Sequence, residues 1–190
     1  MLYYHASQIS GIKILEPRIS NHDIPLIYFS TKRENVLVYL SNAIEKCCKE
    51  KGFNHKNKWH KWASYGFDTD GILTLDEYYP NAIENTYKGV SGFIYYVDTI
   101  QENENSINIS NAITTSEPAT ITDVEFIEDA YSEILKAAEA GLIKIRRYED
   151  MSDKMLSWIE NTIKNEYANA ENEPDYRFFL EEKFDFIKGR

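Results

Sequence analysis

The first forty residues alternate short apolar runs with a helical pattern, and this alternation limits how the chain can fold. Residues 2–5 and 24–29 predict short strands, the second of them rich in Ile, Leu, Tyr and Phe. Residues 32–51 carry apolar side chains at helical spacing, and Thr31 with Glu34 forms a capping box at their start. Strands and a helix in such close succession predict a mixed α+β fold.

Strands and helices are also predicted in the rest of the chain. Further strands are predicted at 72–76, 92–97, 118–122 and 143–148. Further helices are predicted at 80–89, 123–141, 152–168 and 176–187, and a polar mobile loop at 101–110. We therefore expect one α+β domain over residues 1–148, with a helical C-terminal extension over residues 149–190 packed on it.

Composition narrows the class of protein. The chain has 190 residues, of which 43% are apolar, enough for a sizeable core. It has no apolar run long enough for a transmembrane helix, and its start lacks the basic and apolar regions of a secretory signal. We expect a cytoplasmic protein with no membrane segment, in which the adjacent Cys47 and Cys48 are reduced thiols.

The formal net charge of −10 disfavours a sequence-independent grip on nucleic acid, because the phosphate backbone attracts basic surfaces. The charge is uneven, since residues 49–61 are locally basic and the C-terminal third is acidic. An acidic protein of this kind can still present a basic opening to an anionic ligand.

Polar and aromatic side chains end the two N-terminal strands. The first strand runs into His5-Ala6-Ser7 and the second into Tyr28-Phe29-Ser30-Thr31, while Tyr39 lies in the helix that follows. An imidazole, an aromatic platform and a helix-borne Tyr suit a flat heteroaromatic ring attached to a sugar.

The order of these motifs resembles the ADP-ribosyltransferase fold, in the branch with a His–Tyr–Glu triad that diphtheria-type toxins and poly(ADP-ribose) polymerases share. In that branch the first strand ends His-Gly-Ser or His-Gly-Thr, and the second motif is Tyr-Phe-Ala followed by a helix with a second Tyr. The third motif is a Glu that enters a strand, and Glu117 in residues 116–122 fits it best. The resemblance covers residues 1–50 and, more loosely, 113–124. Two positions depart from the pattern: Ala6 replaces the usual Gly, and Pro118 follows Glu117.

The resemblance implies a split β-sheet core with flanking helices and an enzyme that transfers ADP-ribose from NAD to an acceptor. A carboxylate would stabilise the positive charge that develops on the ribose as nicotinamide leaves. The catalytic residues that it implies are Glu117, His5 and Tyr28. The NAD-binding residues that it implies are His5, Ala6, Ser7, Tyr28, Ser30 and Tyr39. No metal site is expected, and the acceptor can be a protein, a nucleic acid or water.

Other interpretations remain open at this stage. Glu125 competes with Glu117 for the role of the acid, although it can simply favour the N-terminal dipole of the helix predicted at 123–141. The chain can also be a non-catalytic module that binds NAD or a related nucleotide. A third interpretation is a partner-binding protein that uses its acidic, aromatic C-terminal helices.

Overall fold

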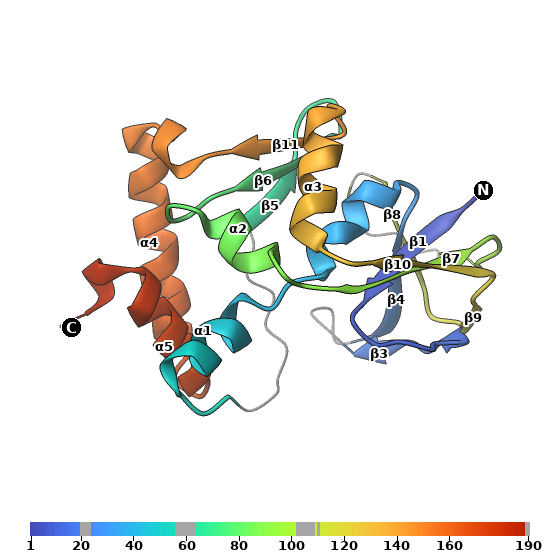
Figure 1. The fold of residues 1–190 in the computed structure, drawn as a ribbon, viewed down its shortest axis with the longest axis horizontal. Coiled ribbons are helices and arrows are strands. Elements are labelled where there is room, and N and C mark those ends of the chain that lie inside the picture. Colours follow the sequence, from blue (N-terminus) through green and yellow to red (C-terminus); the bar gives the residue numbers. More distant parts are fainter. Residues whose placement is uncertain (20–23, 56–63, 102–108, 110, 189–190) are drawn as a thin grey trace.

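The structure, a computed structural model, describes residues 1–19, 24–55, 64–101, 109 and 111–188 (Figure 1). Its largest sheet has the strand order β10-β7-β1-β4-β3, and β8 also pairs with β4. These strands are β1 (Tyr3–Ser7), β3 (Arg18–Ile19), β4 (Pro25–Ser30), β7 (Gly92–Val97), β8 (Ala112–Thr115) and β10 (Asp123–Ile127). All pairs in this sheet are antiparallel.

Two smaller sheets accompany the large one. The three-stranded sheet has the order β11-β6-β5, made of β5 (Ser64–Phe67), β6 (Leu73–Asp76) and β11 (Ile143–Arg146). Its β11 and β6 are parallel, and its β5 and β6 are antiparallel. The third is a two-stranded ladder of β2 (Ile14–Leu15) and β9 (Ala119–Thr120).

Helices join and cover these sheets. The α-helices are α1 (Ala43–Lys51), α2 (Ala82–Tyr87), α3 (Ala130–Glu139), α4 (Asp153–Asn169) and α5 (Pro174–Lys183). The 3-10 helices are η1 (Arg33–Tyr39), η2 (Tyr148–Asp150) and η3 (Asp185–Ile187). Figure 1 shows α1, α4 and α5 together on the left, the large sheet on the right, and α2 and α3 between them. The fold is therefore α+β, as the sequence predicts.

Alternation along the strands gives the large sheet two distinct faces. One face, here called the α3 face, carries Ala6 and Ile94, which pack in a cluster with η1 and α3 side chains such as Leu37 and Ile134. The other, here called the β2–β9 face, carries Tyr3 and Phe29, which pack with side chains of β2 and β9. These two faces decide which of the predicted site residues can meet.

The C-terminal helices pack on the earlier part of the chain through a core of their own. Ile163 of α4 and Phe179 of α5 are fully buried in one cluster with Ile44 of α1 and Tyr79, which lies just before α2. The described part of the predicted extension, residues 149–188, thus shares a core with the domain predicted over residues 1–148. Within the described part of the chain, no helix has the length and apolar character that a membrane span needs.

Most predicted elements correspond to elements of the structure, but the helix predicted over residues 32–51 is wrong. It is two elements, η1 and α1, separated at residues 40–42. The predicted capping box does not form, since η1 starts without any side-chain cap and the Lys32 backbone N–H bonds the Ser30 hydroxyl instead. Four consecutive residues of η1, 35–38, are buried. Four consecutive residues of an α-helix point to all sides, so a helix with only one buried face could not bury them all.

The helix predicted over residues 123–141 is also corrected. Residues 123–127 form the strand β10, which pairs with β7 at five positions, and the helix starts only at Ala130. Asp129 is the true N-cap, because its side chain accepts the backbone N–H of Ser132. The sequence did not predict the strands β2, β3, β5 and β8. The loop predicted at 101–110 lies mostly outside the described residues.

Candidate functional site

The strands that carry the two N-terminal motifs pair only briefly. Within the described residues, β1 and β4 pair at one position, Tyr4 with Ser30, whereas β1 pairs with β7 at five. If the pairing continued, Ala6 would lie opposite Tyr28. In the described chain β1 and β4 do not pair at that position. We call this place the β1–β4 split.

The imidazole of His5 bridges the split. Its Nδ1 lies 2.9 Å from the backbone carbonyl oxygen of Tyr28. Because a carbonyl only accepts hydrogen bonds, Nδ1 is the donor and carries the proton, and the neutral ring has its lone pair on Nε2. Burial lowers the pKa of His5, and the charge of Arg18 acts in the same direction, which favours the neutral ring.

His5 and Tyr28 project from opposite faces of the large sheet. The His5 ring contacts the Phe29 ring on the β2–β9 face, with 6.0 Å between their centroids. Neighbours in a strand alternate, so Tyr28 points to the α3 face. The predicted meeting of these two side chains in one cleft is therefore corrected: His5 reaches the backbone of Tyr28 and not its ring.

The remaining residues predicted to bind NAD are near the split, but most already have partners. Ala6 and Ser30 are buried, the Ser30 hydroxyl accepts the N–H of Lys32, and the Ser7 hydroxyl accepts the N–H of Ile9. Tyr39 ends η1 on the α3 face and packs edgewise on Tyr65, whose hydroxyl is 3.4 Å from its own. Tyr28, Ser30 and Tyr39 thus share the α3 side of the sheet.

Glu117 lies apart from this group. It is exposed in the turn between β8 and β9, where its backbone N–H bonds the Thr115 hydroxyl. This turn leads into the ladder that covers the β2–β9 face. Glu117 thus lies just before the ladder that covers the face opposite to the one to which Tyr28 points.

Glu125 belongs to the α3 face. In the register of the sheet it pairs with Ile94, and Ile94 pairs with Ala6. These positions form one row across β10, β7 and β1, and the row ends at the split where Tyr28 lies. The middle of the row is covered, since Ala6 and Ile94 are buried under η1 and α3. A ligand that reaches from Tyr28 to Glu125 therefore has to displace part of η1.

The carboxylate of Glu125 is held by two neighbouring side chains. Arg33, at the start of η1, donates from Nε to Oε2 at 2.9 Å and from Nη2 to Oε1 at 2.5 Å. The Tyr96 hydroxyl donates to Oε2 at 2.7 Å. The hydrogen bonds from Arg33 are the largest cause that lowers the pKa of Glu125. Arg33 and Tyr96 were not singled out by the sequence, because 92 residues separate Arg33 from Glu125 and no local pattern links them.

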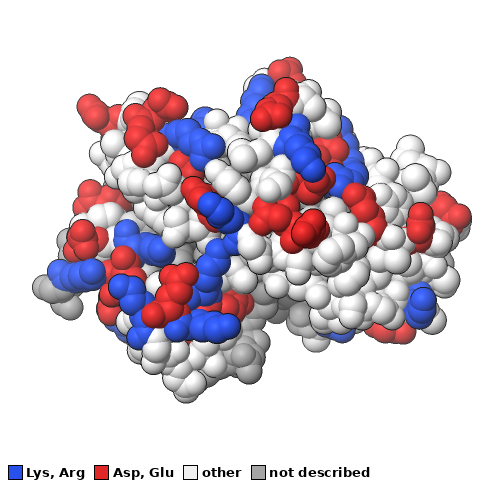
Figure 2. Space-filling model, viewed as in Figure 1, with Lys and Arg blue, Asp and Glu red and all other residues white. Residues whose placement is uncertain are grey.

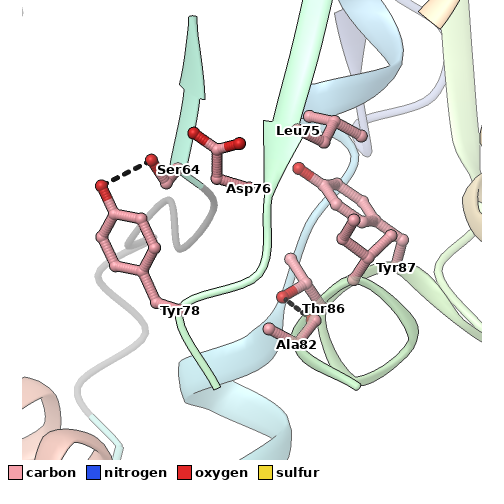
Figure 3. A pocket seen from close by; sticks show the side chains of 8 residues that line it. Ser64, Leu75, Asp76, Tyr78, Ala82, Thr86 and Tyr87 are labelled. Carbon is pink, nitrogen blue, oxygen red and sulfur yellow. Dashed lines mark hydrogen bonds between the residues drawn. The ribbon is translucent and has the colours of Figure 1, made fainter. Parts of the chain in front are cut away.

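The hollows found among the described residues lie elsewhere. The one in Figure 3 is lined by side chains of β5, β6 and α2 and their flanks, among them Ser64, Tyr78 and Tyr87. Its cavity volume of about 10 Å³ is the room that one water molecule needs. The Ser64 hydroxyl donates to the Tyr78 hydroxyl at 2.6 Å beside it. None of the predicted site residues lines it.

Charge is spread unevenly over the surface. Figure 2 shows charged side chains of both signs over α1, α4 and α5 and over the upper part near α3, whereas the large sheet on the right is mostly uncharged. The described residues hold no group of three or more His, Cys, Asp or Glu side chains placed to bind a metal ion.

Comparison of the chain with protein-family models, curated proteins and solved structures gives no match.

Proposed function

We propose that this chain is a glycosyltransferase of the ADP-ribosyltransferase type, which uses NAD as its substrate, with Glu125 as the carboxylate at the reacting ribose. The observation that carries the proposal is a shared surface. Tyr28 and Ser30 of β4 and Glu125 of β10 project from the same face of one sheet, below the helix that ends in Tyr39. Tyr28 and Ser30 of the second motif and Tyr39 thus share the α3 face with Glu125, whereas the His5 ring lies on the other face.

The spacing suits the substrate. Three inter-strand steps of roughly 4.8 Å separate β10 from β4. Once part of η1 is displaced, a Glu and a Tyr side chain that extend toward each other over this span would bracket a group of the size of nicotinamide riboside. Tyr28 and Tyr39 would contact the nicotinamide ring, and the Ala6 backbone at the split would meet the carboxamide. His5 lies on the other face of the sheet, so its role here would be to hold the Tyr28 backbone in place through Nδ1.

The chemistry needs one ionised carboxylate. As the bond between nicotinamide and ribose breaks, its electron pair leaves with nicotinamide and positive charge develops on the sugar. Glu125 would stabilise that charge and bond a ribose hydroxyl, more strongly in the transition state than in the ground state. The acceptor then forms the new bond to the same ribose carbon and loses its proton. Water, a protein side chain or a nucleic-acid base can be that acceptor.

The direct test measures nicotinamide release from NAD by wild type, Glu125→Gln and Glu117→Gln. We expect Glu125→Gln to lose about a hundred- to a thousandfold in kcat, because it removes about 2–4 kcal/mol of transition-state stabilisation. It should still show the rise in melting temperature that NAD produces in wild type. Loss of turnover in Glu117→Gln alone would return the role of the acid to Glu117.

One observation favours a second function. Arg33 and Tyr96 already occupy both oxygens of Glu125, as in a chain that binds the nucleotide without cleaving it. NAD would then raise the melting temperature of wild type while no nicotinamide is released. A protein that shows neither effect, and that associates as its concentration rises, would favour the partner-binding interpretation instead.

A further inference from the structure

Arg33 lies between two carboxylates on different elements. Its Nη2 contacts Glu125 of β10 at 2.5 Å and Glu133 of α3 at 3.0 Å, while its Nε bonds the second oxygen of Glu125. Its side chain is 29% exposed, and those of Glu125 and Glu133 are 34% and 23% exposed. The guanidinium is therefore fixed from two sides in a partly buried position, where bidentate geometry restrains both partners.

The groups around Glu125 come from every element packed against it. Tyr96 of β7 donates its hydroxyl, and the Tyr4 ring of β1 packs edgewise on Tyr96 with 5.2 Å between centroids. Lys136 of α3 contacts Glu133 at 2.8 Å, which places a second cation on the outer side of the group. The charges of the two carboxylates and the two cations therefore cancel. Arg33 contacts both Glu125 and Glu133, whereas Lys136 contacts Glu133.

We propose that Arg33 is a positioning residue that keeps Glu125 ionised and fixes its direction on the α3 face, with Glu133 as the second anchor of the guanidinium. This inference rests on the proposed function, in which Glu125 is the acid at the ribose. It goes beyond that function because it names the group that regulates the state of the acid.

The consequence is a dependence on pH. In Arg33→Gln, Glu125 and Glu133 face one another without a cation between them, so repulsion and partial burial both favour the protonated acid. The pKa of Glu125 therefore rises, and with it the pH below which kcat/KM falls. If the pKa of Glu125 rises by one unit, kcat/KM at a fixed pH well below that pKa falls tenfold.

The experiment measures nicotinamide release from NAD between pH 4.5 and 8.5 for four proteins: wild type, Arg33→Gln, Arg33→Lys and Lys136→Gln. We expect the acid limb of kcat/KM to move up by about one pH unit or more in Arg33→Gln, with a smaller move in Arg33→Lys, whose ammonium cannot bind both oxygens. Lys136→Gln is the matched control, since it removes a cation from Glu133 but none from Glu125. Its acid limb should stay close to that of wild type.

A second readout does not depend on turnover. Carbon-13 NMR of the glutamate carboxyl groups, with the Glu125 signal identified by its loss in Glu125→Gln, follows the titration of this acid directly. An unmoved midpoint in Arg33→Gln, in a folded protein with wild-type turnover, overturns the inference and leaves the proposed function standing. A wild type that releases no nicotinamide overturns the proposed function itself. The two failures are therefore distinct.

Discussion

At the scale of the residue, a single hydrogen bond decides what His5 can do. Its Nδ1 donates to the Tyr28 carbonyl, so the ring is oriented and its tautomer is set. The other ring nitrogen, Nε2, then carries the lone pair and can only accept a hydrogen bond. The His5 side chain thus joins β4 to β1 where the backbone ladder does not.

This environment predicts how stability changes with pH. Burial lowers the pKa of His5 below its ordinary value of 6.5, so the unfolded chain takes up a proton at a higher pH than the folded protein does. The contribution of His5 to stability is therefore present above pH 6.5 and is lost as the pH falls. We expect wild type to lose more free energy of unfolding between pH 7 and pH 5 than His5→Gln, which does not titrate.

Urea unfolding of both proteins at the two pH values measures this difference. Gln keeps a hydrogen-bond donor at the position, so the comparison isolates the titration. Equal losses in the two proteins would show that His5 has the same pKa in the folded and unfolded states.

At the scale of the element, Asp129 separates a strand from a helix that the apolar pattern joins. One of its carboxylate oxygens accepts the backbone N–H of Ser132 at 2.7 Å, inside α3, and the other accepts the N–H of Gly89 at 2.5 Å. Because the cap starts the helix at Ala130, the residues before Asp129 are extended and pair with β7 as β10. That extension puts Glu125 on a sheet face instead of a helix terminus.

We predict that Asp129→Ala destabilises the protein by about 1 kcal/mol, within a range of about 0.5–2 kcal/mol for the loss of a side-chain cap. Asp129→Asn should cost less, because its amide oxygen can still accept the N–H of Ser132. Urea unfolding at pH 7 measures both. An equal loss in the two variants would mean that the charge of Asp129, and not its capping bond, supports α3.

At the scale of the whole molecule, three buried clusters hold the layers together. The first joins the large sheet to η1, α3 and the three-stranded sheet, the second joins α1 to α4 and α5, and the third lies between the large sheet and the β2–β9 ladder. The second cluster also encloses Cys47 and Cys48, which are free and buried, and burial raises the pKa of the Cys48 thiol to about 11.

The second cluster predicts that the C-terminal helices contribute strongly to stability. Phe179→Ala empties a site that is fully buried and should cost about 3–5 kcal/mol in the free energy of unfolding. Phe186→Ala is the matched control, because Phe186 is 39% exposed, and it should cost well under half as much. Thiol labelling at pH 8 supplies a second measurement, in which Cys48 reacts faster in Phe179→Ala than in wild type.

A small loss for Phe179→Ala, together with unchanged labelling of Cys48, would contradict this view. Residues 149–190 would then contribute little to the core around α1. The comparison between two Phe residues of the same C-terminal segment separates burial from the chemistry of the side chain.

Local patterns in the sequence determined the N-terminal strands, the strand at residues 92–97, the end of α1 at Gly52 and the α+β class. These follow from side-chain periodicity and from backbone preferences, which act over a few residues. Gly52, for example, ends α1 with a positive φ of 68°, a conformation that favours glycine whatever the rest of the fold.

Only the tertiary structure decided where the predicted site residues point and which carboxylate shares a sheet face with Tyr28. Residues 123–127 carry an apolar pattern compatible with a helix, and the open edge of β7 made them a strand. The same pairing put Glu125 on the face of Tyr28 and beside Arg33, while Glu117 is exposed in the turn before β9. Strand pairing joins Glu125 to Ile94 and Ile94 to Ala6, which lie far apart in the sequence, so its register and its faces depend on partners that no local window of sequence contains.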